Sequence, residues 1–166
     1  MAVLAECGVI RSVRSNIFMT RPTGIHVQNI SRGNAIIQVP VVGARLAGEE
    51  FSLLDMSGKK FYKADLERSL FVRSILKGTR FVAANLSGAD LSFCQGNGAS
   101  FMDALVTGAR FDNAFLHGAD FRGARGIPGL TGADTRDAML PRKWHDLLKY
   151  GGFGEGIKNF DRIIWV

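Results

Sequence analysis

Residues 81–92 read FVAANLSGADLS, and the spacing of their apolar residues runs through the middle of the chain. In steps of five from Leu46 to Phe121, fifteen of sixteen positions hold a large apolar residue, and Gly96 is the exception. An α-helix repeats about every 3.6 residues and a strand about every two, so neither would keep these side chains on one face. A chain that turns a corner every five residues would place all of them inside.

Two further regularities support this interpretation. The residue two before each large one is small from Ala84 to Ala119, where Cys94 alone replaces alanine. Earlier in the chain the same position also holds larger or polar residues, such as Leu54 and Lys59. A second period of twenty aligns a column of phenylalanines and a column of glycines: Phe61, Phe81, Phe101 and Phe121, and Gly58, Gly78, Gly98 and Gly118. Four fives make twenty, so we expect a four-sided coil with one glycine corner, where φ is positive or the backbone approaches closely.

The segments KADLERS, AANLSGADLS and GADFRGAR resemble the A-(D/N)-(L/F)-x-x motif of the pentapeptide-repeat family, and the resemblance covers residues 44–125. It implies an all-β fold, a right-handed quadrilateral β-helix in which the central residue and the small residue before it point inward. At twenty residues per turn, about four coils are expected. The expected structural core is Leu46, Phe51, Phe61, Leu66, Phe71, Phe81, Leu86, Phe101, Phe111 and Phe121.

Gly96 breaks the pattern, because it stands where a large apolar residue belongs. We expect a local bulge or loop that replaces one side of the coil, with a kink that contacts a partner as the alternative. Cys94, two residues earlier, is then either an inert buried thiol or a reactive one.

The N-terminal flank, residues 1–43, lacks the five-residue period and contains short strand-like runs, so it is predicted to be β-rich. It carries Arg11, Arg14 and Arg21 and has a net charge of +3. These arginines are candidate partner contacts. Two interpretations stay open: a β cap on the coil, or an arm that docks onto another chain.

The C-terminal flank, residues 126–166, begins where the repeat is expected to end, at 127–129. A short helix is predicted over 141–150, with Trp144, Leu147 and Leu148 on one apolar face that closes the coil. Behind it, the apolar tail contains Ile163, Ile164 and Trp165 and ends at Val166. A tail this apolar needs a covering surface, and we favour a partner protein over the chain itself.

The sequence offers no catalytic motif. His26, His117 and His145 stand in separate regions without ligand spacing, and no phosphate loop or dinucleotide fingerprint occurs. We therefore expect no enzyme, no metal and no cofactor. The N-terminus does not resemble a signal peptide and no run is long enough to cross a membrane, so the expected location is the cytoplasm or a particle assembled there.

The family's best-known members protect type II topoisomerases by imitating DNA with an acidic surface. Residues 44–125 carry 11 basic and 9 acidic residues, a net charge of +2, which disfavours such mimicry. Nucleic-acid binding is a second alternative, because basic residues gather near Lys59, but carboxylates interrupt them. We expect a structural or protein–protein interaction module, a subunit of a larger assembly such as a virus particle. Its partners would bind through the two flanks, and a homo-oligomer is left open.

Overall fold

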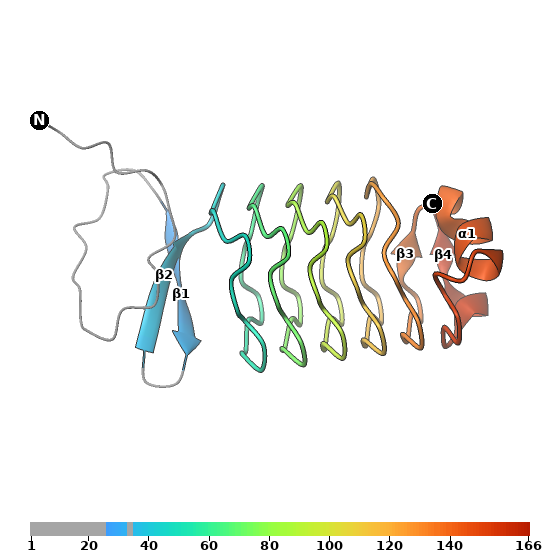
Figure 1. Ribbon diagram of the computed structural model, residues 1–166, viewed down its shortest axis with the longest axis horizontal. Coiled ribbons are helices and arrows are strands. Elements are labelled where there is room, and N and C mark those ends of the chain that lie inside the picture. The colour runs from blue at the N-terminus through green and yellow to red at the C-terminus, as the bar shows by residue number, and fades with distance from the viewer. Residues whose placement is uncertain (1–25, 33–34) are drawn as a thin grey trace, which may run out of the picture.

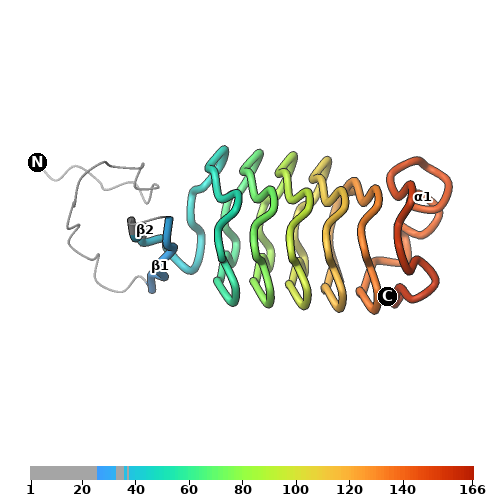
Figure 2. Tube along the Cα trace, turned by 90° about the horizontal axis from the view of Figure 1, so that it is seen from below, coloured from blue at the N-terminus to red at the C-terminus, as the bar shows by residue number. Residues whose placement is uncertain are grey.

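The computed structural model describes residues 26–32 and 35–166. It shows a straight stack of coils with a β-hairpin at one end and a short helix at the other (Figure 1). A view turned by 90° shows the same even stacking through the middle of the molecule (Figure 2). The long axis of the molecule is therefore the axis of the coil.

Parallel backbone bridges join residues twenty apart along four columns, one on each side of the coil. The columns start at Arg45, Glu50, Asp55 and Lys60, which pair with Asp65, Leu70, Ile75 and Arg80. Each side contributes one bridge per turn, because the chain leaves the side again after five residues. The middle of the molecule consequently contains isolated bridges in place of long strands.

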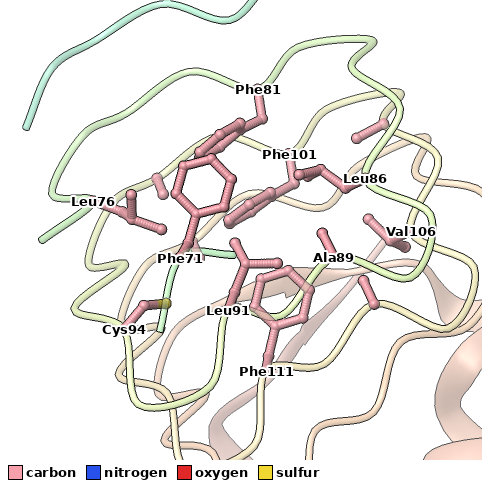
Figure 3. Packing of buried hydrophobic residues seen from close by; sticks show 14 of the residues in the cluster. Phe71, Leu76, Phe81, Leu86, Ala89, Leu91, Cys94, Phe101, Val106 and Phe111 are labelled. Carbon is pink, nitrogen blue, oxygen red and sulfur yellow. The ribbon is translucent and has the colours of Figure 1, made fainter. Parts of the chain in front are cut away.

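The interior is filled by the residues that recur every five. All ten expected core residues are almost fully buried, and Figure 3 shows several of them pointing into the coil. The rings of Phe61, Phe81, Phe101 and Phe121 stack with centroids 5.3, 5.2 and 4.6 Å apart. Phe71 and Phe111 meet this column edge-on. Offset stacking and edge contacts are the favoured arrangements of aromatic rings, so the column stabilises successive turns against one another.

The corners of the coil use the left-handed backbone conformation. The glycine column from Gly58 to Gly118 has φ of 64–67°, and a Cβ at these positions would meet nothing within 4 Å. Positive φ, and not close approach, therefore explains these glycines. Other corners place ordinary residues at the same φ, including Leu53, Arg73 and Phe93.

Gly96 does not form a bulge or loop, so that expectation is wrong. Its N–H donates to the Phe115 carbonyl at 2.8 Å, and the bridges from Ile75 through Gln95 to Phe115 keep the period of twenty. A Cβ at Gly96 would lie 3.0 Å from Leu116 Cδ2 and 3.6 Å from Cys94 Sγ. The neighbouring Leu116 fills the space that a large residue would have occupied, and the register is kept.

The coil also continues beyond residue 125. Arg110 pairs with Gly129 and Phe115 pairs with Asp134, so the period shortens from twenty to nineteen. Gly126, at φ +81°, lies where a Cβ would come within 2.7 Å of the Thr107 backbone nitrogen. The close approach at Gly126 lets this turn be made with one residue fewer. Because the large residues beyond it are shifted by one position, counting in steps of five along the sequence did not detect the further turn.

The C-terminal end is closed by a helical insertion. Strand β3 (Met139–Leu140) leads into the 3₁₀ helix η1 (Arg142–Trp144) and helix α1 (His145–Tyr150). After a loop, the 3₁₀ helix η2 (Phe160–Arg162) precedes β4 (Ile164–Trp165), which pairs in parallel with β3. Trp144 is fully buried with its ring 5.8 Å from that of Phe121, so it continues the aromatic column into the cap.

At the other end, β1 (Val27–Arg32) and β2 (Ala35–Pro40) form an antiparallel hairpin. Ile30 and Val39 are buried in the same core as the coil. The Gln28 amide bonds both backbone groups of Lys60, accepting from its N–H at 2.7 Å and donating to its carbonyl. Residues 26–32 and 35–40 therefore cap the first turn, while the strand-like runs predicted before residue 25 lie outside the described residues.

Candidate docking surfaces

The described residues hold no group of three or more histidine, cysteine or acidic side chains that could bind a metal. His117 pairs with Asp137 at 3.1 Å, and His145 pairs with Asp146 at 2.7 Å. His26 lies at the hairpin, on the opposite end from His145. In the part of the chain that the structure describes, no helix is long and apolar enough to span a membrane.

The outward carboxylates of the coil stabilise turns. Asp55, Asp90 and Asp120 each accept a hydrogen bond from the backbone N–H two residues ahead, at 2.8, 2.9 and 3.0 Å. Such Asx turns favour the change of direction at a corner. Arg122 also binds Asp120, with an N–O distance of 2.7 Å. These carboxylates have structural partners, and the geometry does not pair any two of them for acid–base chemistry.

The Cys94 thiol is buried inside the coil, where Figure 3 shows it among apolar side chains. Burial raises the pKa of this thiol to about 12. Because the thiolate is the nucleophilic form, Cys94 is an inert side chain at neutral pH. Of the two alternatives for this residue, the structure supports the inert one.

The C-terminal cap carries a group of exposed apolar side chains. Tyr150, at the end of α1, is 73% exposed, and Leu147 and Phe153 are almost half exposed. We call these three residues the cap surface. Leu148, in contrast, is buried below the helix. The helix thus uses Leu148 to close the coil and presents Leu147, which was expected on the buried face, to solvent.

Two shallow hollows lie at the two ends of the coil. One, of about 260 Å³, is lined by Arg142, His145, Asp146 and Trp165. The other, of about 610 Å³, lies between the hairpin and the first turn and includes Lys59 and Tyr62 in its lining.

The residues predicted as partner contacts fall into two groups. Arg11, Arg14 and Arg21 lie outside the described residues. Ile163 is buried within the chain, Trp165 is partly buried and Ile164 is half exposed. The preference for a partner over the tail's own chain is therefore wrong for Ile163, because β4 adds to the coil beside β3.

The residues that the sequence reasoning missed are those of the cap surface. Leu147 was assigned to the buried face because its spacing from Trp144 suits one α-helical face, and the short 3₁₀ segment η1 upsets that spacing. Tyr150 carries a weak signal, since it stands directly before Gly151 and Gly152 at the predicted end of the helix.

Residues 45–121 match the protein-family model described as pentapeptide repeat region. A crystal structure of a pentapeptide repeat protein from the Arabidopsis thaliana thylakoid lumen is 31% identical, with 71% of this chain and 82% of that chain covered and a TM-score of 0.59. Such proteins imply a right-handed quadrilateral β-helix.

Two further solved structures are more distant. HetL, a pentapeptide repeat protein involved in heterocyst differentiation regulation from the cyanobacterium Nostoc sp., is 18% identical, covers 60% of this chain and 65% of its own, and has a TM-score of 0.42. A trypsin-treated form of QnrB1, a plasmid-mediated fluoroquinolone resistance protein, is 26% identical, covers 61% and 50%, and has a TM-score of 0.46. A comparison with curated proteins found no match.

Proposed function

Because this chain belongs to the pentapeptide repeat family, we propose that it is a non-catalytic protein-interaction module whose coil is a rigid spacer and whose ends bind other proteins. The observation that carries the proposal is the cap surface of Leu147, Tyr150 and Phe153. Exposed apolar side chains that gather within one short segment mark interaction sites more often than scattered single ones do.

The rigidity of the coil supports the role of a spacer. Backbone hydrogen bonds of 2.7–3.1 Å join each of the middle turns to the next, and the aromatic column runs from Phe61 to Trp144 without a break. Two docking ends held at a fixed separation suit a subunit of a larger assembly, such as a virus particle. The hairpin end, where Ile36 and Val42 are exposed, would provide the second contact.

The test is the mass of the native particle that contains the chain, measured by sedimentation of material from its source. We expect a complex well above the 18.1 kDa of one chain. Tyr150→Ser together with Leu147→Ser should release the chain from that complex without lowering its thermal stability. Arg68→Ser, a change at an exposed corner of the coil away from both ends, is the control and should leave the complex intact.

A free monomer in the native extract would contradict the proposal. Inhibition of supercoiling by a type II topoisomerase, with no stable complex of other proteins, would support DNA mimicry in its place. The slight positive charge of residues 44–125 speaks against that result.

A further inference from the structure

One corner of the coil carries large apolar side chains where the backbone does not favour them. Leu53, Arg73, Phe93 and Asn113 occupy this corner in four successive turns, at φ of 63, 56, 59 and 57°. Glycine and asparagine adopt such angles with least strain, whereas leucine and phenylalanine are uncommon there. Leu53 is nonetheless 75% exposed and Phe93 is 46% exposed. Neither backbone preference nor burial in the core explains these two residues.

The next bridge column brings two more apolar side chains to the same place. The Ile75 N–H donates to the carbonyl of Leu54, and the Phe115 N–H donates to that of Cys94, both at 2.9 Å. The Ile75 backbone therefore pairs with the residue that follows Leu53, and the backbone of Phe115, whose side chain is 52% exposed, pairs with the residue that follows Phe93. We call Leu53, Arg73, Ile75, Phe93 and Phe115 the corner surface.

The charge on the corner surface is positive. The Arg73 guanidinium carbon lies 5.7 Å from the centre of the Phe93 ring, a cation–π distance. Among the ion pairs of the described residues, none involves Arg73 or the neighbouring Lys77. In the following turns, Asp90 and Asp112 are both bound by Arg110. Asp55, which bridges to Ile75 from the turn before, is a carboxylate without an ion pair to any described residue, at the edge of this surface. Arg73 and the neighbouring Lys77 nonetheless outnumber it, so the corner surface combines apolar area with an excess of positive charge.

The surroundings leave room for a partner to lie along the coil. The next corner after Ile75 is the glycine column, where Gly78 and Gly98 present no side chain and a Cβ would meet nothing within 4 Å. The residue between Ile75 and Phe115 in the bridge column is Gln95, which is exposed and uncharged. Lys77, Asn97 and His117 lie between the column of Ile75 and this glycine column, so the cation of Lys77 borders the corner surface.

We propose that the corner surface binds an acidic amphipathic α-helix of a partner protein, laid along the axis of the coil. Leu53 and Phe93 are two turns apart, roughly 9.6 Å at the usual strand spacing. Side chains seven residues apart on a helix are separated by roughly 10.5 Å, which matches this distance. A carboxylate between them on the helix would meet Arg73. A second copy of this chain is a less favourable occupant, because its Arg73 and Lys77 would lie close to Arg73 and Lys77 of the first copy, and like charges repel.

The experiment measures binding of three fluorescent peptides of about 15 residues to the full chain by anisotropy. The first is an acidic amphipathic helix of leucine and glutamate with leucines at i, i+3 and i+7. The second replaces each glutamate by lysine, and the third scrambles the order of the first. We expect the first to bind with a dissociation constant of roughly 10–100 μM, weakening with salt. The basic and scrambled peptides should bind at least about tenfold more weakly.

Phe93→Asn separates binding from folding, because asparagine at this φ already occurs in the same corner at Asn113. The variant should keep or raise the melting temperature of the chain, and its affinity for the acidic peptide should be at least about tenfold lower. Arg73→Glu should weaken it similarly. Arg68→Asn, an exposed position at φ 55° on another corner, is the matched control and should not change binding. Phe115→Gln copies Gln95 of the same column and is a second test of the apolar contact.

Four results would overturn the proposal. Equal binding of the acidic and basic peptides would remove the charge argument. If Phe93→Asn and Phe115→Gln both bind the acidic peptide as tightly as the unchanged chain, the corner surface is not the binding site. The same conclusion follows if the acidic peptide does not bind at roughly 1 mM. A dimer of the chain alone that Phe93→Asn dissolves would assign the surface to a second copy. None of these results depends on the cap surface, so the two proposals fail separately.

Discussion

Two sets of phenylalanines in this coil have opposite environments. Phe61, Phe81, Phe101 and Phe121 stack at the centre and are fully buried, whereas Phe93 and Phe115 stand on the outside and are about half exposed. The residue type is the same, and the difference is the position within each group of five. The inner set holds the turns together. The outer set is left about half exposed to solvent and contributes little to the core.

Hydrophobicity alone does not identify the core residues of this fold. Two residues after each large inward position the chain turns with positive φ, and a side chain there points to solvent. An apolar residue therefore stabilises the coil at one position, whereas the same residue at another position stays exposed and is available for the proposed contact with a partner. The following predictions test this division, beginning with the largest effect.

Phe101→Ala should lower the free energy of unfolding by about 3–5 kcal/mol, because it removes a fully buried ring from the middle of the column. Denaturant unfolding followed by circular dichroism measures the change. Phe115→Ala is the matched control, with an expected loss below about 1 kcal/mol. Equal losses in the two variants would show that the inner and outer sets do not differ as described.

Gly126→Ala should lower the free energy of unfolding by about 1–3 kcal/mol, since its Cβ would come within 2.7 Å of the Thr107 nitrogen. Gly58→Ala shares the positive φ but meets nothing within 4 Å, so about 1 kcal/mol is expected. Chemical denaturation of both variants gives the difference. A smaller loss for Gly126→Ala than for Gly58→Ala would argue against the tight passage between the turns.

Phe93→Asn should leave the free energy of unfolding unchanged or raise it by up to ~1 kcal/mol, because asparagine relieves strain at φ 59°. Loss of the contact with Arg73 limits the gain. Differential scanning calorimetry measures it. A clear loss of stability would mean that Phe93 stabilises the coil, as the inner phenylalanines do.

The smallest effect is the pH dependence of the outer carboxylates. Burial raises the pKa of Asp120, but hydrogen bonds from the Arg122 side chain and backbone outweigh it and hold this pKa below its usual range. A folded pKa below the unfolded one means that the stabilisation is present above about pH 4 and is lost as the pH falls through the folded value. Asp120→Asn should therefore flatten the acid limb of the stability curve. An unchanged acid limb would show that this ion pair does not contribute.

Much of the coil could be predicted because its signal is periodic. The inward column, the glycine corner and the closing tryptophan all follow from spacings of five and twenty and from one helical pattern. Prediction failed where the chain keeps its register by unusual means. Gly96 lacks a side chain, yet Leu116 of the next turn fills the space. At Gly126 one residue is missing, and a close backbone passage restores the pairing from Gly129 onward.

The candidate surfaces were less accessible to sequence reasoning. Tyr150 and Leu147 are exposed because the 3₁₀ helix η1 rotates the start of α1, which a regular helical spacing does not anticipate. Phe93 and Phe115 lie outside the inward register, but only their neighbours in adjacent turns make them one surface. Arg11, Arg14 and Arg21 are still predictions.

By itself the sequence determined the four-sided coil, because only a corner every five residues buries every large side chain at that spacing. It also determined which residues face inward and that one corner is a column of glycines. The tertiary structure decided how far the coil continues, how Ile163 to Trp165 close it and which outward side chains meet. Those outcomes depend on contacts between turns twenty or so residues apart, where one filled gap or one missing residue changes the result without changing the local pattern.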